Sequence, residues 1–281
     1  MYTLNIKGRL VAMERPLVMG IFNATPDSFY ESSSNQSASS ALAQITKMVT
    51  DGADIIDVGG QSTRPGSTKI EAEEELQRVL PIIELIKNNF PNVLISIDTY
   101  YEIVAKAAVE KGADIVNDIS GGSIDVNMLA TVGQLNVPYI CMHIKGTPQT
   151  MTTLTSYENI LAEMMQYFNE RIISCKAVGI KDIIIDPGFG FAKKPSQNFY
   201  LLNELQYFKE LGLPILVGLS RKKTIWETLG ITANEALNGT TVLNTIALTK
   251  GANILRVHDV KEAVEAVKLV EMLQQRNENS K

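Results

Sequence analysis

The stretch 54–66 contains the residue types that bind a phosphate group. Residues 55–58 form a short apolar, β-branched run with one acid, Asp57, set inside it, and two glycines follow. A buried parallel strand has this near-continuous apolar character. The glycines allow a ligand to approach the backbone closely, while Thr63 supplies a hydroxyl donor and Arg64 a bidentate guanidinium. We therefore expect an anion to bind directly after a buried strand.

Polar side chains also follow seven other apolar runs of the chain. They include Asn23, Asp98, Asn117, His143, Asp186, Lys222, Arg256 and His258. A single acid after a strand is most often a helix cap or a turn residue, but that explanation would have to hold independently at every strand end. Arg256 and His258 are two residues apart, so both side chains emerge on one face of a strand. We interpret the set as a candidate active site, with His143 as a packed or orienting residue.

Eight apolar runs alternate with segments of helical periodicity. The expected strands cover residues 17–22, 54–58, 93–97, 115–117, 137–142, 182–185, 214–219 and 253–257. Gly52, Gly112 and Gly251 come just before three of them, where a left-handed residue ends a helix. Eight β-then-α units predict a (β/α)8 TIM barrel, as a single domain over residues 1–281. A doubly wound open sheet is the alternative.

The composition restricts the classes of partner and the compartment. The 281 residues are 45% apolar and carry a formal net charge of -5, which argues against a general nucleic-acid binder. The two cysteines, Cys141 and Cys175, are too few for a disulfide framework and lack zinc-ligand spacing. No apolar stretch approaches the length of a signal region or membrane span. We expect a cytoplasmic protein.

Seven segments together are similar to a known set of motifs. They are residues 19–29, 57–66, 96–99, 116–120, 186–191, 220–222 and 256–258. In order and spacing they closely resemble the motifs of dihydropteroate synthase, and the resemblance covers essentially the whole chain. That family joins 6-hydroxymethyl-7,8-dihydropterin pyrophosphate to p-aminobenzoate in folate biosynthesis, and it releases pyrophosphate. The resemblance thus implies a transferase of small-molecule substrates, and a homodimer.

The resemblance also assigns roles to individual residues. The implied pterin-binding residues are Asp98, Asn117, Asp186 and Lys222. The implied pyrophosphate-binding residues are Asn23, Thr63, Arg64, Arg256 and His258, with Mg²⁺ near Asn23. The implied p-aminobenzoate-binding residues are Thr63, Pro65, Phe191 and Lys222. The implied catalytic residues are Asp98, Asp186, Lys222 and Arg256.

The weak nucleophilicity of p-aminobenzoate indicates the order of the reaction. Its amine lone pair is delocalised into the ring, whereas the pterin methylene can share positive charge with its ring system. We expect an SN1-like order in which pyrophosphate leaves first, with Asp98 and Asp186 stabilising the pterin cation. Loops 25–40 and 62–68 are expected to close the site.

The chain departs from the family pattern at three places. Lys223 stands where the family usually has a serine for the p-aminobenzoate carboxylate, Ala192 stands where glycine is common, and residues 30–34 replace a frequent Asp-Gly-Gly sequence. The resemblance therefore leaves open whether the chain is a target of sulfonamides, which mimic p-aminobenzoate, or a sulfonamide-tolerant variant. Two other functions are alternatives: a pterin-dependent methyltransferase domain, and a non-catalytic pterin-binding regulatory barrel.

Overall fold

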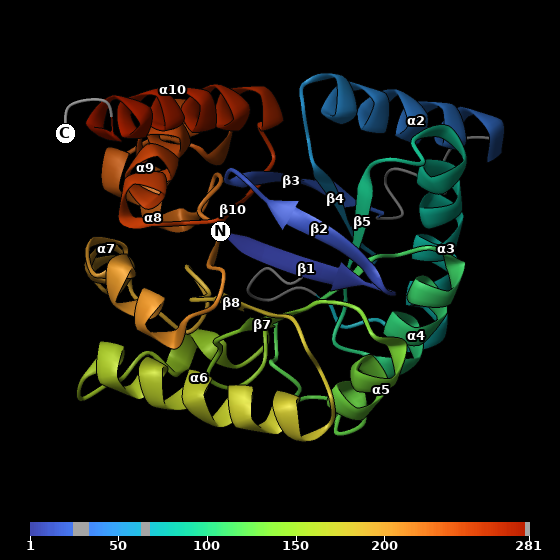
Figure 1. The fold of residues 1–281 in the computed structure, drawn as a ribbon, viewed down its shortest axis with the longest axis horizontal. Coiled ribbons are helices and arrows are strands. Elements are labelled where there is room, and N and C mark those ends of the chain that lie inside the picture. The colour runs from blue at the N-terminus through green and yellow to red at the C-terminus, as the bar shows by residue number, and fades with distance from the viewer. Residues whose placement is uncertain (25–33, 63–67, 279–281) are drawn as a thin grey trace.

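Eight parallel strands form the centre of the molecule (Figure 1). The computed structural model describes residues 1–24, 34–62 and 68–278. The eight strands are β3 (Leu17–Asn23), β4 (Ile55–Gly59), β5 (Leu94–Asp98), β6 (Ile115–Asp118), β7 (Tyr139–Met142), β8 (Ile183–Asp186), β9 (Leu216–Val217) and β10 (Ile254–Val257). Their order in the sheet is β8-β7-β6-β5-β4-β3-β10-β9, so neighbours in the sheet are largely neighbours in the sequence.

The sheet closes into a barrel between its two outer strands, β8 and β9. Ile185 and Ile215 form a parallel bridge, and the Ile185 backbone N–H donates to the Pro214 carbonyl over 3.0 Å. The predicted (β/α)8 barrel is therefore confirmed, and the open-sheet alternative is wrong. The strand expected over residues 214–219 is shorter than predicted, because only Leu216–Val217 pairs in a regular ladder.

Helices surround the barrel and cover its outer face (Figure 1). They are α2 (Ser34–Thr50), α3 (Ala72–Asn89), α4 (Glu102–Lys111), α5 (Met128–Leu135), α6 (Ile160–Ala177), α7 (Pro195–Asn203), α8 (Lys223–Leu229), α9 (Leu237–Lys250) and α10 (Val260–Glu278). Three 3₁₀ helices are η1 (Met151–Thr153), η2 (Leu205–Leu211) and η3 (Ala233–Glu235). The helix α3 turns an apolar stripe to the core, which includes Val79, Ile83 and Ile86. None of the helices in the described ranges is long and apolar enough to cross a membrane.

A β-hairpin that the sequence did not reveal lies across the amino-terminal end of the barrel. Its strands are β1 (Tyr2–Ile6) and β2 (Arg9–Met13), joined by Lys7 and Gly8 with φ of 51° and 91°. Positive φ at both central residues is the requirement of a tight hairpin turn. Buried side chains of the hairpin pack against the lower residues of the barrel strands, so that end is filled with apolar atoms.

The inward-facing residues change character along the barrel axis. The lower layer is apolar: Met19, Ile55, Leu94, Ile115, Ile140, Ile184, Leu216 and Ile254. Side chains two positions later face the same way, because a strand has a period of two. They are Ile21, Asp57, Ser96, Asn117, Met142, Asp186, Gly218 and Arg256. The carboxyl end of the barrel, where barrel enzymes hold their active sites, is therefore polar.

Candidate active site

A buried group of four side chains occupies the carboxyl end of the barrel. The Arg256 Nε atom lies 2.6 Å from Asp57 Oδ2, and Arg256 Nη2 lies 2.5 Å from Asp98 Oδ2. Asn117 Nδ2 donates to the same Asp57 oxygen over 3.1 Å. The residues come from β10, β4, β5 and β6, so the barrel alone brings them together. Two carboxylates share one guanidinium, which leaves the group one negative charge in excess.

Each of the two carboxylates keeps one oxygen that accepts no hydrogen bond from the described residues. Asp57 Oδ1 and Asp98 Oδ1 are buried, and neither has a hydrogen-bond partner among the residues of the described ranges. An unsatisfied buried acceptor costs about 1–3 kcal/mol, so these oxygens favour a ligand with N–H or O–H donors. Burial raises the pKa of Asp98 to about 7, although the charge of Arg256 opposes the shift. Burial lowers the pKa of Arg256, but the carboxylates outweigh it and the net shift is upward.

Asp186 and Lys222 extend this group on the far side of the barrel. Asp186 Oδ1 accepts from the Gly188 backbone N–H over 2.7 Å, and burial raises the pKa of this carboxyl. Lys222 Nζ donates to the Phe189 carbonyl and lies 4.5 Å from the centroid of the Phe191 ring. Burial lowers the pKa of Lys222 to about 8, with the Asp186 charge acting against it. An ammonium over an aromatic face is a cation–π arrangement.

Gly218 lies between Lys222 and Arg256 at the carboxyl end of the barrel. A Cβ atom at Gly218 would lie 3.9 Å from both Lys222 Nζ and Arg256 Cβ. The glycine therefore leaves free the volume that a side chain would fill between the two cations, where most other strands place larger inward-facing groups. Carboxylates and cations lie together at this end of the barrel, which suits a ligand with both donors and negative charge.

A buried lysine, Lys193, holds the loop that carries Phe191. Its Nζ donates over 3.0 Å to the carbonyls of Gly188 and Phe191, and it lies 3.0 Å from His143 Nδ1. Burial lowers the pKa of Lys193 to about 7 and moves the pKa of His143 well below its usual value, so the neutral imidazole accepts. His143 also packs edge-on against Tyr167, with ring centroids 4.9 Å apart. The interpretation of His143 as a packed residue is confirmed, whereas no sequence pattern pointed to Lys193.

A buried acid outside this group, Glu75, supports the segment before residues 63–67. Its Oε2 accepts from Thr99 Oγ1 over 2.9 Å and from Gln61 Nε2 over 3.4 Å, and Gln61 Oε1 accepts from Tyr100 over 2.9 Å. Burial raises the pKa of Glu75 to about 8. One signal was available in the sequence, because Glu75 precedes Val79 by four positions on the apolar stripe of α3.

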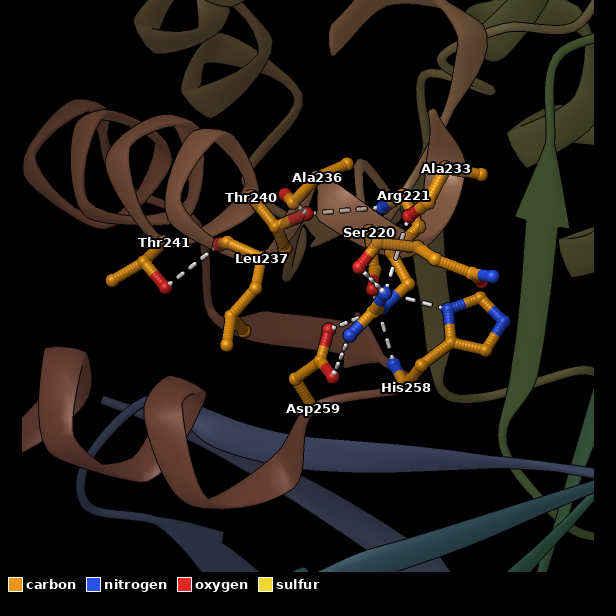
Figure 2. Close-up of polar contacts among 10 residues, drawn as sticks. Ser220, Arg221, Ala233, Ala236, Leu237, Thr240, Thr241, His258 and Asp259 are labelled. Atoms are coloured by element: carbon orange, nitrogen blue, oxygen red, sulfur yellow. Dashed lines mark hydrogen bonds and ion pairs between the residues drawn. The ribbon is translucent and has the colours of Figure 1, made fainter. Parts of the chain in front are cut away.

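The loop after β9 and the end of β10 contact each other through Ser220 and His258. Ser220 Oγ accepts from the His258 backbone N–H over 3.1 Å and lies 3.1 Å from His258 Nδ1. Figure 2 shows the imidazole ring beside Ser220, while the neighbouring Arg221 points to Asp259. His258 and Lys222 are thus placed by one loop, although they are 36 positions apart in the sequence.

Comparison with known proteins decides the family. A profile of the family described as pterin binding enzymes matches residues 19–258. The dihydropteroate synthase of Escherichia coli strain K12 is 42% identical to this chain over 277 residues, which are 98% of each chain. The chain belongs to the dihydropteroate synthase family. The resemblance inferred from the motifs is therefore confirmed.

Solved structures of dihydropteroate synthases have the same fold. The Yersinia pestis enzyme in complex with a sulfonamide drug has a TM-score of 0.91 and 36% identity, and the match covers 98% of this chain and 100% of that one. The Xanthomonas albilineans enzyme with 4-aminobenzoic acid has a TM-score of 0.88 and 38% identity, covering 97% and 98%. Both matches span the barrel and the carboxyl end at which the buried polar groups lie.

The structure brings together most of the side chains expected in a dihydropteroate synthase site. Asp98, Asn117, Asp186, Lys222 and Arg256 meet at the carboxyl end of the barrel, with Phe191 against Lys222. Asn23 ends β3 beside Gly59, with its side chain exposed. Thr63, Arg64 and Pro65 lie outside the described residues, as does the first part, 25–33, of the expected loop 25–40. The expectation of a loop is wrong for residues 34–40, which form the first turns of α2. Asp57 was recognised in the sequence as an acid within an apolar run, but its place in the site was missed.

The described residues also indicate how Mg²⁺ fits this site. Within the ranges that the structure covers, no group of three or more His, Cys, Asp or Glu side chains could hold a metal ion. The one amide at the end of β3, Asn23, is exposed at the barrel mouth. Mg²⁺ prefers oxygen ligands and retains waters, so one amide oxygen together with phosphate oxygens is a normal site for it. The residues therefore fit a metal that arrives with an anionic substrate.

Proposed function

We propose that this chain joins 6-hydroxymethyl-7,8-dihydropterin pyrophosphate to p-aminobenzoate, forming 7,8-dihydropteroate and releasing pyrophosphate. One observation carries the proposal beyond family membership: buried carboxylates, two of them with an oxygen that no described residue hydrogen-bonds, lie at the same end of the barrel as an amide and an ammonium. A pterin edge carries an amino group and ring N–H donors for carboxylates, and a carbonyl for an amide or ammonium donor. Asp98 and Asp186 would accept from the pterin, while Asn117 and Lys222 would donate to it.

The pyrophosphate binds, in this proposal, beside the pterin at Asn23, Thr63, Arg64, Arg256 and His258. Arg256 supports this placement because its guanidinium is held at the barrel mouth in one orientation by Asp57 and Asp98. A cation about 4 Å from a phosphate oxygen contributes about 4 kcal/mol at an effective dielectric near 20. Mg²⁺ held near Asn23 would further neutralise the charge on the leaving pyrophosphate. The oriented Arg256 side chain stabilises the same charge as it develops.

Breaking of the C–O bond comes first in the proposed mechanism. The electron pair of that bond leaves with pyrophosphate, and the pterin methylene becomes a cation that Asp98 and Asp186 stabilise. The p-aminobenzoate nitrogen then uses its lone pair to form the C–N bond, and its proton is lost to solvent. Thr63, Pro65, Phe191 and Lys222 would border the p-aminobenzoate site, and a sulfonamide would compete there. The ammonium of Lys222 over the Phe191 ring supports a site for a carboxylated aromatic amine.

We further propose that the chain is a cytoplasmic homodimer and that residues 1–281 act as a single domain. Exposed apolar side chains support an interface on α9 and α10. Val242 and Ile246 are 49% and 37% exposed on α9, and Leu269 and Met272 are 69% and 56% exposed on α10. Sedimentation equilibrium tests this directly, since a monomer at micromolar concentration contradicts the dimer.

The first experiment follows both products of the proposed reaction. The purified chain is given the dihydropterin pyrophosphate and Mg²⁺, with and without p-aminobenzoate, while pyrophosphate and dihydropteroate are measured in parallel. We expect both products to form together and to be lost in Arg256→Ala. Pyrophosphate released without p-aminobenzoate supports departure of the leaving group before capture. A chemical rate that does not change with a poorer leaving group contradicts that order.

Two other results point to other functions. Binding of the pterin without either product in this experiment indicates a regulatory barrel. In a separate assay with methyltetrahydrofolate and a corrinoid, methyl transfer indicates a methyltransferase domain. Arg256 at the barrel mouth disfavours both, because neither function needs to hold a pyrophosphate.

A further inference from the structure

We propose that Arg221 is a positioning residue. Its contacts with Asp259 and with η3, here called the clamp, hold Lys222 and His258 at a fixed separation across the site. The inference rests on the proposed function for the roles of Lys222 and His258. The Arg221 guanidinium donates to Asp259, Ala233 and Asn234, and Arg221 is not among the residues assigned to either proposed substrate. It acts through its two neighbours and through the helix that begins after His258.

The Arg221 guanidinium joins three segments that are distant in the sequence (Figure 2). Nε and Nη2 donate to the two carboxylate oxygens of Asp259 over 2.9 and 2.8 Å. Nη1 donates to the carbonyls of Ala233 and Asn234 over 3.1 and 2.7 Å. All three guanidinium nitrogens thus donate, and the pair with Asp259 has a bidentate geometry that a lysine cannot form. The side chains of Arg221 and Asp259 are 25% and 16% exposed, so the pair is largely shielded from water.

The backbone of Arg221 is part of the same clamp. Its φ is 53°, in the left-handed region that few residues other than glycine adopt readily. Its N–H donates to Thr240 Oγ1 on α9 over 3.0 Å, which holds that conformation. Strained backbone of this kind persists where surrounding structure over-determines it, and it gathers at functional sites. The turn sends the Arg221 side chain outward to Asp259, while Ser220 contacts His258 and Lys222 contacts the Phe189 carbonyl.

Two site residues depend on this turn. Lys222 follows Arg221 directly, and its Nζ reaches the Phe189 carbonyl and the Phe191 ring. His258 precedes Asp259 directly, and Ser220 Oγ accepts from its backbone N–H. The Arg221–Asp259 ion pair therefore links the residue directly before Lys222 to the residue directly after His258. The clamp sets the separation between the proposed pterin and pyrophosphate ends of the site.

The test removes the guanidinium while it keeps the turn. Arg221→Gly accepts a positive φ without strain, so any loss of function is due to the missing side chain. Arg221→Lys keeps the charge but lacks the fork. The matched control is Arg15→Gly, because Arg15 makes a bidentate pair with Asp54, with distances of 3.0 and 2.7 Å, near the opposite end of the barrel. All variants are assayed for kcat, both KM values and binding of inorganic pyrophosphate.

We expect Arg221→Gly to lower kcat/KM for the dihydropterin pyrophosphate by about 100-fold, since a displacement near 1 Å has that effect. Pyrophosphate binding should weaken in the same variant, and added methylguanidinium should restore part of kcat. Arg221→Lys should not restore it. Arg15→Gly should stay within about twofold of the unmodified protein, because exposed ion pairs contribute little.

Three results would contradict the proposal that the clamp positions Lys222 and His258. They are unchanged kinetics in Arg221→Gly, full activity in Arg221→Lys, and losses in Arg15→Gly equal to those in Arg221→Gly. If Arg221→Gly does not fold, Asp259→Asn removes the ionic partner at constant shape and carries the same expectations. If the unmodified protein forms no dihydropteroate, the proposed function fails by itself. The clamp is then decided by pyrophosphate binding, which must still weaken in Arg221→Gly but not in Arg15→Gly.

Discussion

Arg256 Nε and Asp57 Oδ2 lie 2.6 Å apart, in a buried pair that joins β10 to β4 across the intervening β3. The side chain of Asp57 is fully buried, whereas that of Arg256 is 19% exposed. Asp57 therefore holds the guanidinium from inside the barrel, and one edge of the guanidinium stays open to the barrel mouth. Asp98 binds the other end of the same guanidinium, so Arg256 has one orientation before any ligand binds.

This pair predicts the effect of changing Asp57 to Asn. The variant loses a charged partner for Arg256, and a hydrogen bond to a charged group contributes about 1.5–3 kcal/mol. We expect the free energy of unfolding to fall by about 2 kcal/mol and kcat/KM to fall with it, because Arg256 then turns toward Asp98. Urea unfolding gives the stability. Asp54→Asn, in the partly exposed pair with Arg15, should cost less than about 1 kcal/mol. An equal cost in both variants would contradict a special role for Asp57.

The second prediction concerns the pH dependence of pterin binding. Burial raises the pKa of Asp98 to about 7 and lowers that of Lys222 to about 8. The proposed mode needs an ionised Asp98 to accept and a protonated Lys222 to donate. Affinity should therefore be greatest between these two values and should fall on both sides.

A dihydropterin without pyrophosphate is the ligand to use, because phosphate ionisation then plays no part. Binding is measured by calorimetry across the neutral range. Lys222→Arg should move the alkaline fall to higher pH, since a guanidinium does not deprotonate there. A binding curve that is flat through this range in the unmodified protein would refute the assignment.

Glu75 predicts a pH dependence of stability. Burial raises its pKa from 4.5 to about 8 in the folded protein. A group with a raised folded pKa stabilises the fold below its unfolded pKa, and that contribution is lost as pH rises through the folded pKa. One proton changes the free energy of unfolding by about 1.4 kcal/mol per pH unit within that window.

We therefore expect Glu75→Gln to be more stable than the unmodified protein at high pH, with a difference that shrinks as pH falls toward 4.5. Urea unfolding of both proteins at several pH values measures this difference. Because all other acids are the same in the two proteins, their titration cancels in the difference. Glu74→Gln is the matched control, because Glu74 is one position earlier on α3 and its side chain is 52% exposed. A constant difference at all pH values would show that Glu75 is ionised throughout.

Lys223 predicts a change in affinity for p-aminobenzoate. Lys223 begins α8, its side chain is 66% exposed, and its Nζ lies 3.6 Å from Glu227 Oε1. The ammonium is thus directed along the helix, while the family usually has a hydroxyl at this position. Lys223→Ser should lower the Kd for p-aminobenzoate, and for a sulfonamide, by about fivefold. This change corresponds to the roughly 1 kcal/mol that one hydrogen bond contributes.

Calorimetry with each ligand measures this change. Lys223→Ala separates the two possible causes, since it removes the ammonium without adding a hydroxyl. Equal gains in the two variants would assign the effect to loss of the lysine. Weaker binding in Lys223→Ser would show that the ammonium itself attracts the carboxylate.

Local pattern in the sequence was sufficient for the strands and for their polar ends. Apolar runs followed by Asp98, Asn117, Asp186 and Arg256 already indicated a barrel with its site at the carboxyl end, because side-chain period and strand direction are local properties. The left-handed residues that end α4 and α9, Gly112 and Gly251, were equally predictable. The hairpin β1–β2 was missed, since its role depends on the open barrel end that it covers.

Only the tertiary structure decided which charges meet. Arg256 was expected to bind pyrophosphate, which stays a prediction, and the fold pairs it with Asp57, a residue 199 positions away. The buried Lys193 and the Arg221–Asp259 clamp were likewise absent from any sequence pattern, and the one signal for Glu75 was its place on the apolar stripe of α3. Barrel closure and burial create these contacts, because desolvation makes a charge costly unless a partner from another strand or loop lies within hydrogen-bond distance. Spacing along the sequence carries no information on that distance. The sequence by itself therefore determined which strand ends carry polar groups, and the closed barrel determined which of these groups pair with each other.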